Sequence, residues 1–296
     1  MTDATAPAAP PSGHAGAGRS LWREAGSRLL RNPGAVAGIT ALALLLLVAL
    51  SAPWITAYDP VRMAPAERLQ APNAAHWFGT DSFGRDIYTR VVYGARVSLQ
   101  VGFVAVAIAL GLGATLGMIA GYAGGRVEGL IMRLVDVTLA FPGILLALAI
   151  IAILGPDLVN AMIAVGISAS PTYARVARGS VKQTKELPYI EAAVQSGARA
   201  WRIVVFHVLP NVIAPIVVVA TLGIGQAIIA GASLSFLGLG ARPPTAEWGL
   251  MLSEGRHYLR HAWWIATFPG IAIMITVLSV NLLGDGLRDA IDPRLR

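Results

Sequence analysis

Long apolar stretches, almost free of charged residues, alternate with shorter polar segments along this chain. They cover residues 34–55, 99–122, 134–154, 158–170, 212–234 and 263–283. An α-helix rises about 1.5 Å per residue, so ~20 residues cross the ~30 Å hydrocarbon core of a bilayer. The fourth stretch is shorter and stops near Pro171, and its continuation as a helix through Arg175 stays open. The pattern predicts an all-α, polytopic membrane protein with six transmembrane helices.

The composition supports a membrane location. Of the 296 residues, 55% are hydrophobic and only 13% are charged, about half of the roughly 25% found in soluble domains. The chain has no cysteine, which excludes disulfides and thiolate metal sites. Its net charge of +7 could indicate nucleic-acid binding, but basic cytoplasmic loops explain it better in a membrane protein. We therefore expect a lipid bilayer as partner and no nucleic acid.

The ends of the chain and its basic residues predict the topology. Residues 1–18 are mostly small residues, Pro and Gly, which cannot form a packed core, so we expect a disordered tail. The first apolar stretch lies too far from the N-terminus and is too long for a signal peptide, so we interpret it as an uncleaved span. Lys and Arg are more frequent in the segments that are cytoplasmic if the N-terminus is inside. Six spans then place both termini on the cytoplasmic side of the membrane.

The chain lacks the motifs of an enzyme or an ATPase. It contains no GxxxxGK[ST] phosphate-binding loop, no HExxH and no GxSxG, so we expect no catalytic, cofactor or metal site. The spans hold few ionisable groups, and Asp136, Asp157 and Asp285 fall near predicted span ends. Ion-coupled carriers and membrane-embedded enzymes need such groups inside their spans. A transporter subunit energised by another protein is therefore preferred over a secondary carrier, a channel or an enzyme.

Two sets of residues inside the spans have alternative interpretations. Gly113, Gly117 and Gly121 are spaced by four and share one helix face. Such a face could line a pore, but close packing of helices through small residues is the preferred reading. Four polar residues in or near spans could contact a solute or hydrogen-bond to neighbouring helices, and the second role is preferred. These four are Asn160, Asn211, Gln226 and Asn281.

The segment from 171 to 207 is the longest and most basic loop predicted inside. Pro188 suits the first position of a helix, where no backbone N–H is needed, and Gly197 suits the left-handed residue that ends one. The sequence predicts a short helix over 189–196, a sharp turn, and a second amphipathic helix over 198–208 at the membrane surface. Another protein could approach the small residues closely, or the helix could lie on lipid headgroups.

Here the sequence resembles a known family. Glu191-Ala192-Ala193, then Gly197, then His207-Val-Leu209-Pro210 resembles the EAA motif of ABC importer permeases. The family generally has an aliphatic residue at the place of His207, and the form found here resembles its peptide/nickel branch, in particular the C-type permeases. Three further stretches resemble that branch, and the four together span most of residues 30–296. These stretches are 76–98, 234–249 and 281–293.

The resemblance implies a type I ABC importer permease fold, a location in the inner membrane of a bacterial cell, and a set of partners. The expected partners are a second homologous permease, two ABC ATPase subunits and an extracytoplasmic solute-binding protein. The EAA loop would be the coupling helix that docks on the ATPase. The coupling residues expected from the motif and its flanks are Pro188, Tyr189, Glu191, Ala192, Ala193, Gly197, His207, Leu209 and Pro210.

The resemblance also divides the chain and leaves its solute open. The expected parts are a tail over 1–33, a first span with an outer loop over 34–96, a permease domain over 97–286, and a tail over 287–296. Dipeptides, longer peptides, glutathione, nickel chelates and opine-like solutes all remain compatible. The charged outer stretch from Asp81 to Arg96 could contact a binding protein or solute, or form an internal salt-bridge cluster, and the internal cluster is preferred.

Overall fold

The computed structural model describes residues 26–291, and all of its named elements are helical. The predicted disordered segment 1–18 and the last five residues of the predicted C-terminal tail lie outside the described residues. The helices are α2 (Pro33–Ile55), α3 (Ile87–Ala109), α4 (Thr115–Ala123), α5 (Gly125–Leu139), α6 (Gly143–Leu154), α7 (Leu158–Lys185), α8 (Pro188–Gln195), α9 (Ala200–Ile203), α10 (Leu209–Phe236), α11 (Trp248–Gly255) and α12 (Trp264–Ile291). Short 3-10 turns cover Pro65–Glu67 and Arg256–Tyr258, and π-helical turns cover Leu110–Ala114 and Val204–Val208.

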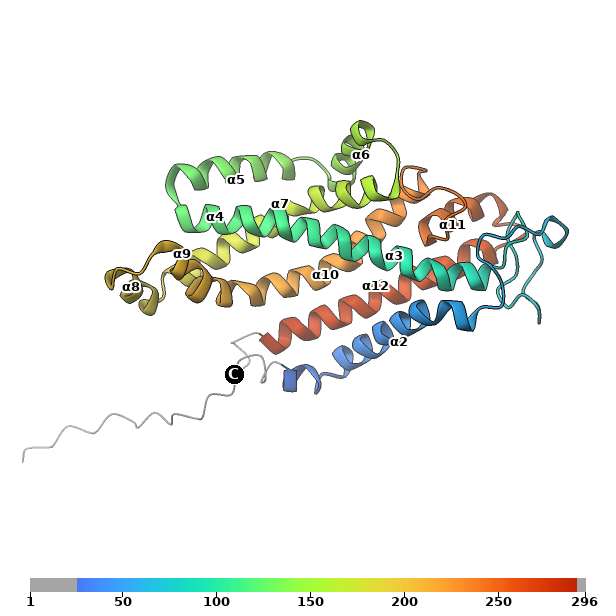
Figure 1. Ribbon diagram of the computed structural model, residues 1–296, viewed down its shortest axis with the longest axis horizontal. Coiled ribbons are helices and arrows are strands. Elements are labelled where there is room, and N and C mark those ends of the chain that lie inside the picture. The colour runs from blue at the N-terminus through green and yellow to red at the C-terminus, as the bar shows by residue number, and fades with distance from the viewer. Residues whose placement is uncertain (1–25, 292–296) are drawn as a thin grey trace, which may run out of the picture.

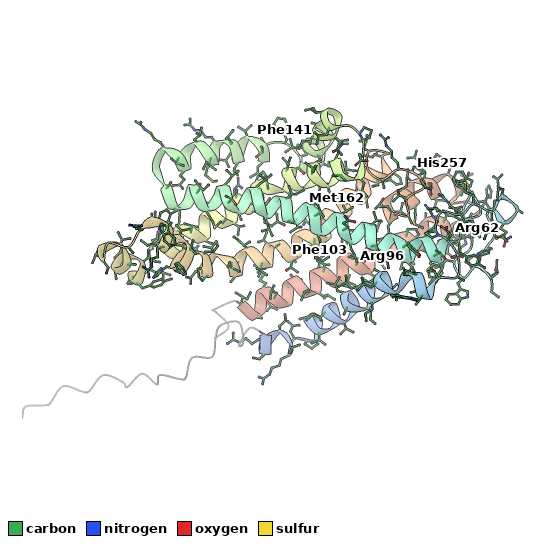
Figure 2. All side chains as sticks on the ribbon, in the orientation of Figure 1. Arg62, Arg96, Phe103, Phe141, Met162 and His257 are labelled. Atoms are coloured by element: carbon green, nitrogen blue, oxygen red, sulfur yellow. The ribbon has the colours of Figure 1, made fainter. Side chains whose placement is uncertain are left out.

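Most of the long helices run side by side along the long axis of the molecule (Figure 1). Helix α12 packs between α2 and α10, while α7 packs on α3, α4 and α10. The short helices α8 and α9 lie at one end of the bundle, and α11 and the loop after α2 lie at the other (Figure 1). Side chains cover the bundle along its whole length (Figure 2).

The predicted spans are largely confirmed. Four helical segments of the described chain are long and apolar enough to cross a membrane: Pro33–Ile55, Ile87–Ala123, Ala200–Phe236 and Trp264–Ile291. The pair α5 and α6 makes a fifth span if it is counted as one. Helix α7, with 28 residues, runs among them but is less apolar, so the arrangement is consistent with six helices that cross.

The third predicted span is not a straight helix. The apolar run 134–154 is broken after Leu139, and the axes of α5 and α6 meet at 94°. Pro142 stands at the break, immediately before α6. Proline lacks the N–H that a continuing helix needs and disfavours helical geometry in the residue before it, which explains the break.

The fourth span is longer than its apolar run. Helix α7 continues past Pro171 to Lys185, although the missing N–H of Pro171 leaves the carbonyl of Ile167 without its helical donor. The Ser170 hydroxyl donates to that carbonyl at 2.8 Å. A neighbouring hydroxyl thus replaces the lost hydrogen bond and allows the helix to continue.

The second piece of the predicted inner loop differs from the expectation of a separate surface helix. Residues 200–236 form one helical path, with a π-helical turn at Val204–Val208 just before Pro210. A wider turn at this place separates the proline ring from the preceding carbonyls, so the helix enters the membrane without breaking.

Glycines bring α7 and the α3–α4 helix into backbone contact. A Cβ added at Gly113 would lie 2.1 Å from the carbonyl oxygen of Ser170, and one at Gly117 would lie 2.2 Å from that of Ala174. Lipid tails are as apolar as leucine, so association in the membrane depends on such close packing. The preferred reading of the glycine face, helix packing, agrees with the structure.

We predict that Gly117→Ala destabilises the bundle, whereas Gly111→Ala does not. The new methyl group of Gly117→Ala would meet the Ala174 carbonyl, and overpacking of this kind costs about 1–3 kcal/mol. Gly111, two residues before Gly113, has open space around its Cβ position. The measurement is the thermal unfolding midpoint of each purified variant in detergent. Equal midpoints for the two variants would contradict this role of the glycine face.

Candidate functional site

The predicted loop helix forms with the expected boundaries. Pro188 stands at the start of α8, and Gly197 follows its end with φ of 76°. The N–H of Gly197 donates to the carbonyl of Val194, and the N–H of Ala198 donates to that of Ala193. This is a Schellman motif, which depends on the left-handed residue and joins the end of α8 firmly to the next segment.

One side chain of α8 anchors it to the bundle. Ile190 is 3% exposed and packs with Val181 of α7 and Val212 of α10. Pro188, Tyr189, Glu191 and Ala192 are exposed and Ala193 is half-buried against the same cluster, so α8 holds a narrow face inward and presents most of its surface outward. Sequence reasoning missed Ile190, although its buried apolar position within an amphipathic helix is a readable signal.

The two halves of the predicted motif lie close together. The rings of Tyr189 and His207 stack with centroids 6.3 Å apart. Asn211 connects both, since its side-chain nitrogen donates to the Tyr189 hydroxyl at 2.9 Å and to the His207 carbonyl at 2.7 Å. Asn211 therefore stabilises the contact between α8 and the start of α10, a role closer to the preferred reading of hydrogen bonding than to contact with a solute. Leu209 and Pro210 begin α10 beside this contact.

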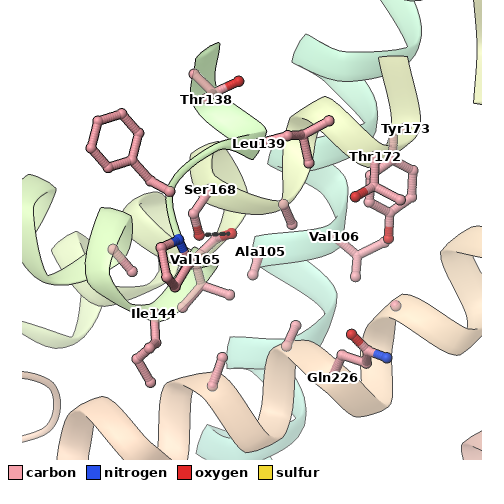
Figure 3. A pocket seen from close by; sticks show the side chains of 18 of the residues that line it. Ala105, Val106, Thr138, Leu139, Ile144, Val165, Ser168, Thr172, Tyr173 and Gln226 are labelled. Atoms are coloured by element: carbon pink, nitrogen blue, oxygen red, sulfur yellow. Dashed lines mark hydrogen bonds between the residues drawn. The ribbon is translucent and has the colours of Figure 1, made fainter. Parts of the chain in front are cut away.

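A cavity of about 670 Å³ lies between α3, α5, α6, α7 and α10. Its wall is mainly apolar, with the polar side chains of Thr138, Ser168, Thr172, Tyr173 and Gln226 (Figure 3). The described residues that line it include no charged side chain. Its size falls in the range of small-molecule sites, roughly 300–1,000 Å³. Of these residues the sequence singled out only Gln226, because hydroxyl side chains in apolar helices are too common to be informative.

At the opposite end from α8, the charged outer stretch forms a buried network. Arg85 donates through Nε to Asp81 at 2.6 Å and through NH2 to Glu254 at 2.8 Å. Arg90 adds a contact to Glu254 at 3.4 Å. Arg85 and Arg90 are each 1% exposed and Asp81 is 3% exposed, so an internal salt-bridge cluster is the reading that the structure supports.

Two neighbours of this network stabilise helix ends. Asp86 accepts the Thr89 N–H at the start of α3 and lies 2.9 Å from Nδ1 of His76. Arg96 donates to the carbonyls of Ala49 and Leu50 in α2. The Ala49 carbonyl lacks a helical N–H donor because Pro53 follows four residues later. Arg96 supplies the missing hydrogen bond and thereby links α3 to α2.

Glu247 stabilises the start of α11 at the same end of the bundle. Its carboxylate accepts the N–H groups of Gly249 and Leu250 at 2.9 and 2.8 Å and so caps α11. Burial raises the pKa of the Glu247 carboxyl, and the hydrogen bonds from Gly249 and Leu250 oppose this rise. The side chain is 1% exposed, which indicates a structural role.

We predict that Arg85→Gln destabilises the outer end, whereas Arg62→Gln leaves it unchanged. Removing one partner of a buried ion pair leaves charges uncompensated and costs about 3–5 kcal/mol. Arg62 is exposed in the same outer loop. The measurement is the yield and thermal midpoint of each variant purified in detergent. A midpoint for Arg85→Gln equal to that of Arg62→Gln would contradict the structural reading.

An all-helical membrane bundle with a solute-sized internal cavity, and with a short helix presented at one end, has the architecture of a transport permease. Comparison with known proteins agrees. Residues 113–296 match the family described as binding-protein-dependent transport system inner membrane component. Residues 20–72 match the N-terminal transmembrane domain of oligopeptide transport permease C. The chain belongs to the family of binding-protein-dependent transport permeases.

Individual relatives cover almost the whole chain. A dipeptide transport system permease protein of Alkalihalophilus pseudofirmus is 52% identical over 94% of this chain and 91% of the relative. A glutathione transport system permease protein of Pectobacterium atrosepticum is 47% identical over 94% and 93%. A di/tripeptide transport system permease protein of Pseudomonas aeruginosa is 45% identical over 90% and 89%.

A solved structure shares the fold. An inward-facing structure of the MetNI methionine ABC transporter superposes with a TM-score of 0.57 at 20% identity, covering 70% of this chain and 98% of that one. This chain is therefore a multi-pass inner-membrane permease subunit of an ABC importer, a component that works with ATPase and binding-protein partners.

Proposed function

We propose that this chain pairs with a second, homologous permease to form a translocation path for di- and oligopeptides or related solutes. Two ATPase subunits energise the path from the cytoplasm, and a binding protein delivers the solute from outside. The peptide class rests on the relatives named for dipeptide, di/tripeptide and glutathione transport. Nickel chelates remain a second solute class, since the sequence resembles the shared peptide/nickel branch.

The proposed parts of the chain follow the helices only in part, because the boundaries at 96 and 286 fall inside α3 and α12. A cytoplasmic tail ends near residue 33, where Asn32 caps α2. Residues 34–96 form the first span and the outer loop, 97–286 form the permease domain, and 287–296 return to the cytoplasm. The end of the bundle that carries α8 then faces the cytoplasm, and the end that carries α11 faces outward.

The observation that carries the proposal is the way in which α8 is attached to the bundle. Tyr189 and Val194 are 45% and 56% exposed, while Ile190 packs between α7 and α10 with Ala193 beside it. Both α7 and α10 line the cavity. A force applied to α8 is therefore transmitted through a short, capped connection to the walls of the path. We assign the coupling role to Pro188, Tyr189, Glu191, Ala192, Ala193, Gly197, His207, Leu209 and Pro210.

The mechanism has the form of alternating access. ATP draws the two ATPase subunits together, and each coupling helix moves with the subunit beneath it. Because α8 is held by its anchor and its Schellman motif, α7 and α10 turn as stiff bodies and the cavity opens to the other side. In this scheme the chain contributes the helix that transmits motion and the walls of the solute path, while ATP hydrolysis occurs in the partner ATPase subunits.

We predict that Gly197→Val uncouples ATP hydrolysis from transport. A β-branched residue at φ of 76° is strained by about 1–3 kcal/mol, so the end of α8 must rearrange. Gly155→Val is the matched control, because Gly155 also has positive φ (89°) and open surroundings but lies at the end of α6, away from α8.

The measurement uses the complete transporter in proteoliposomes with its binding protein. We expect Gly197→Val to insert normally and to lower the solute transported per ATP on the order of tenfold, and Gly155→Val to keep the wild-type ratio. Wild-type uptake by Gly197→Val would overturn the coupling role.

Co-purification tests the proposed assembly. In mild detergent, the tagged wild-type chain should carry with it a second permease and the ATPase subunits, identified by mass spectrometry. A single species that moves solute into liposomes without ATP would instead establish a secondary carrier.

A further inference from the structure

One face of α7 carries a polar stripe. Ser168, Thr172, Arg175, Gly179 and Lys182 follow one another at intervals of four, three, four and three residues, which places them on one side of a helix. Thr172, Arg175 and Lys182 are exposed. A Cβ at Gly179 would meet no other atom, so this face is open along its length. The stripe also explains why α7 is less apolar than the other long helices.

The stripe begins at the cavity. Ser168 and Thr172 line the cavity wall together with Thr138 of α5 (Figure 3). One turn beyond Thr172, Arg175 donates to Asp136 of α5 at 2.9 Å. Further on, Lys182 lies 3.1 Å from Glu128 of α5. Polar side chains therefore recur along this side of α7 from the cavity to the end of the bundle that carries α8, with Gly179 between Arg175 and Lys182.

The Arg175–Asp136 ion pair is about half exposed, and it lies at the same level along the bundle as exposed apolar side chains of α5. The side chains of Arg175 and Asp136 are 58% and 64% exposed. On the same helix, Leu134 and Val137 flank Asp136 in sequence and are 63% and 60% exposed. Those apolar side chains suit lipid or a second permease, whereas a charged pair at this depth needs water or a polar partner. The stripe must therefore face water or polar groups, whereas the apolar face of α5 faces lipid or a second permease.

The pair is suited to exchange partners. An exposed ion pair contributes little to stability, because water already solvates both groups. A passing solute with an ammonium and a carboxylate group can replace each partner by a similar one at small net cost. The uncharged cavity offers such a solute only hydroxyl and amide groups, so the pair supplies the first charged contacts after the cavity.

We propose that this stripe lines the cytoplasmic half of the solute path, with Arg175 and Asp136 binding the carboxylate and ammonium groups of a zwitterionic solute as it leaves the cavity. The proposal rests on the transport function proposed above and narrows its solute class to zwitterions. Arg175 acts through its guanidinium, which pairs well with a carboxylate, and Asp136 through its carboxylate. Both residues then influence transport rate rather than ATP hydrolysis.

The first experiment tests the path independently of the solute. The chain has no cysteine, so Thr172→Cys and Leu47→Cys each provide a single thiol. Leu47 lies on α2 and is 61% exposed on an apolar surface. Inside-out membrane vesicles containing the complete transporter are treated with a charged, membrane-impermeant thiol reagent, which reacts with thiolates in contact with water. We expect labelling of Thr172→Cys and none of Leu47→Cys. Absence of labelling in both would overturn the path.

The second experiment tests the charged pair with radiolabelled dialanine. The variants are Arg175→Gln, Asp136→Asn, and the reversed pair D136R/R175D, assayed in proteoliposomes with ATPase and binding protein. We expect each to lower dialanine uptake about tenfold, the effect of one lost charge-assisted hydrogen bond, with binding-protein-stimulated ATP hydrolysis retained.

The reversed pair separates recognition from structure. It restores an ion pair between α5 and α7 but presents the charges to the solute in exchanged positions, so uptake should stay low. Restored uptake in D136R/R175D would show a structural pair and overturn the recognition role. If the wild-type complex does not transport dialanine, the zwitterion assignment and the peptide class fail together, while labelling of Thr172→Cys still decides whether the stripe is part of a path.

Discussion

Backbone contact between α7 and the α3–α4 helix is the interaction on which the rest of this bundle depends. The face formed by Gly113, Gly117 and Gly121 lies against the backbone of α7, and no side chain larger than hydrogen fits between. In lipid, apolar side chains gain little by leaving their surroundings, so close approach of two backbones is a main source of association. The contact fixes α7 along much of its length, and α7 carries one wall of the cavity and the mounting of α8.

The two ends of the bundle are held by different means. At the α11 end, Arg85, Arg90 and Glu254 form a network whose charges are removed from water, and such a network is stable only while all partners remain. At the α8 end, Ile190 enters a small apolar cluster, with Ala193 half-buried beside it, and most of α8 is presented outward. The first arrangement suits a fixed cap, and the second suits a surface that receives a partner and moves with it.

The sequence predicted the elements that depend on local rules. The boundaries of α2 and of α8 follow from apolar length, from Pro188 and from Gly197, because each rule acts within a few residues. The continuation of α7 depended instead on the Ser170 hydroxyl, which satisfies the Ile167 carbonyl that Pro171 leaves free. The break before α6 was hidden because an apolar run has the same composition whether its helix is straight or bent, although Pro142 marked the place.

The functional sites were also predictable only where they depend on local sequence rules. The spacing of the predicted coupling residues was visible in the sequence, and the structure places Tyr189 beside His207. The sequence could not reveal that Asn211 connects these two residues, because Asn211 lies 22 positions after Tyr189. The cavity was not predictable, because it arises where helices distant in sequence meet. The spacing of the polar stripe of α7 is present in the sequence, but its start at the cavity and its contacts with α5 depend on the fold. Asp136 becomes a candidate contact for the solute only because Arg175, 39 residues later, lies 2.9 Å away.

The division of α7 into two faces has a mechanical consequence. Its glycine-packed face cannot slide on α4 without a clash between backbones, so α3, α4 and α7 must move as one body. Its polar face, by contrast, meets α5 through ion pairs, of which Arg175–Asp136 is more than half exposed, and an exposed pair re-forms at little cost after a shift of the partner. Motion that starts at α8 is therefore expected to change the relation of α7 to α5 rather than to α4. The boundary between those two helices borders the cavity, so a contact that can re-form lies where an alternating-access path has to open and close.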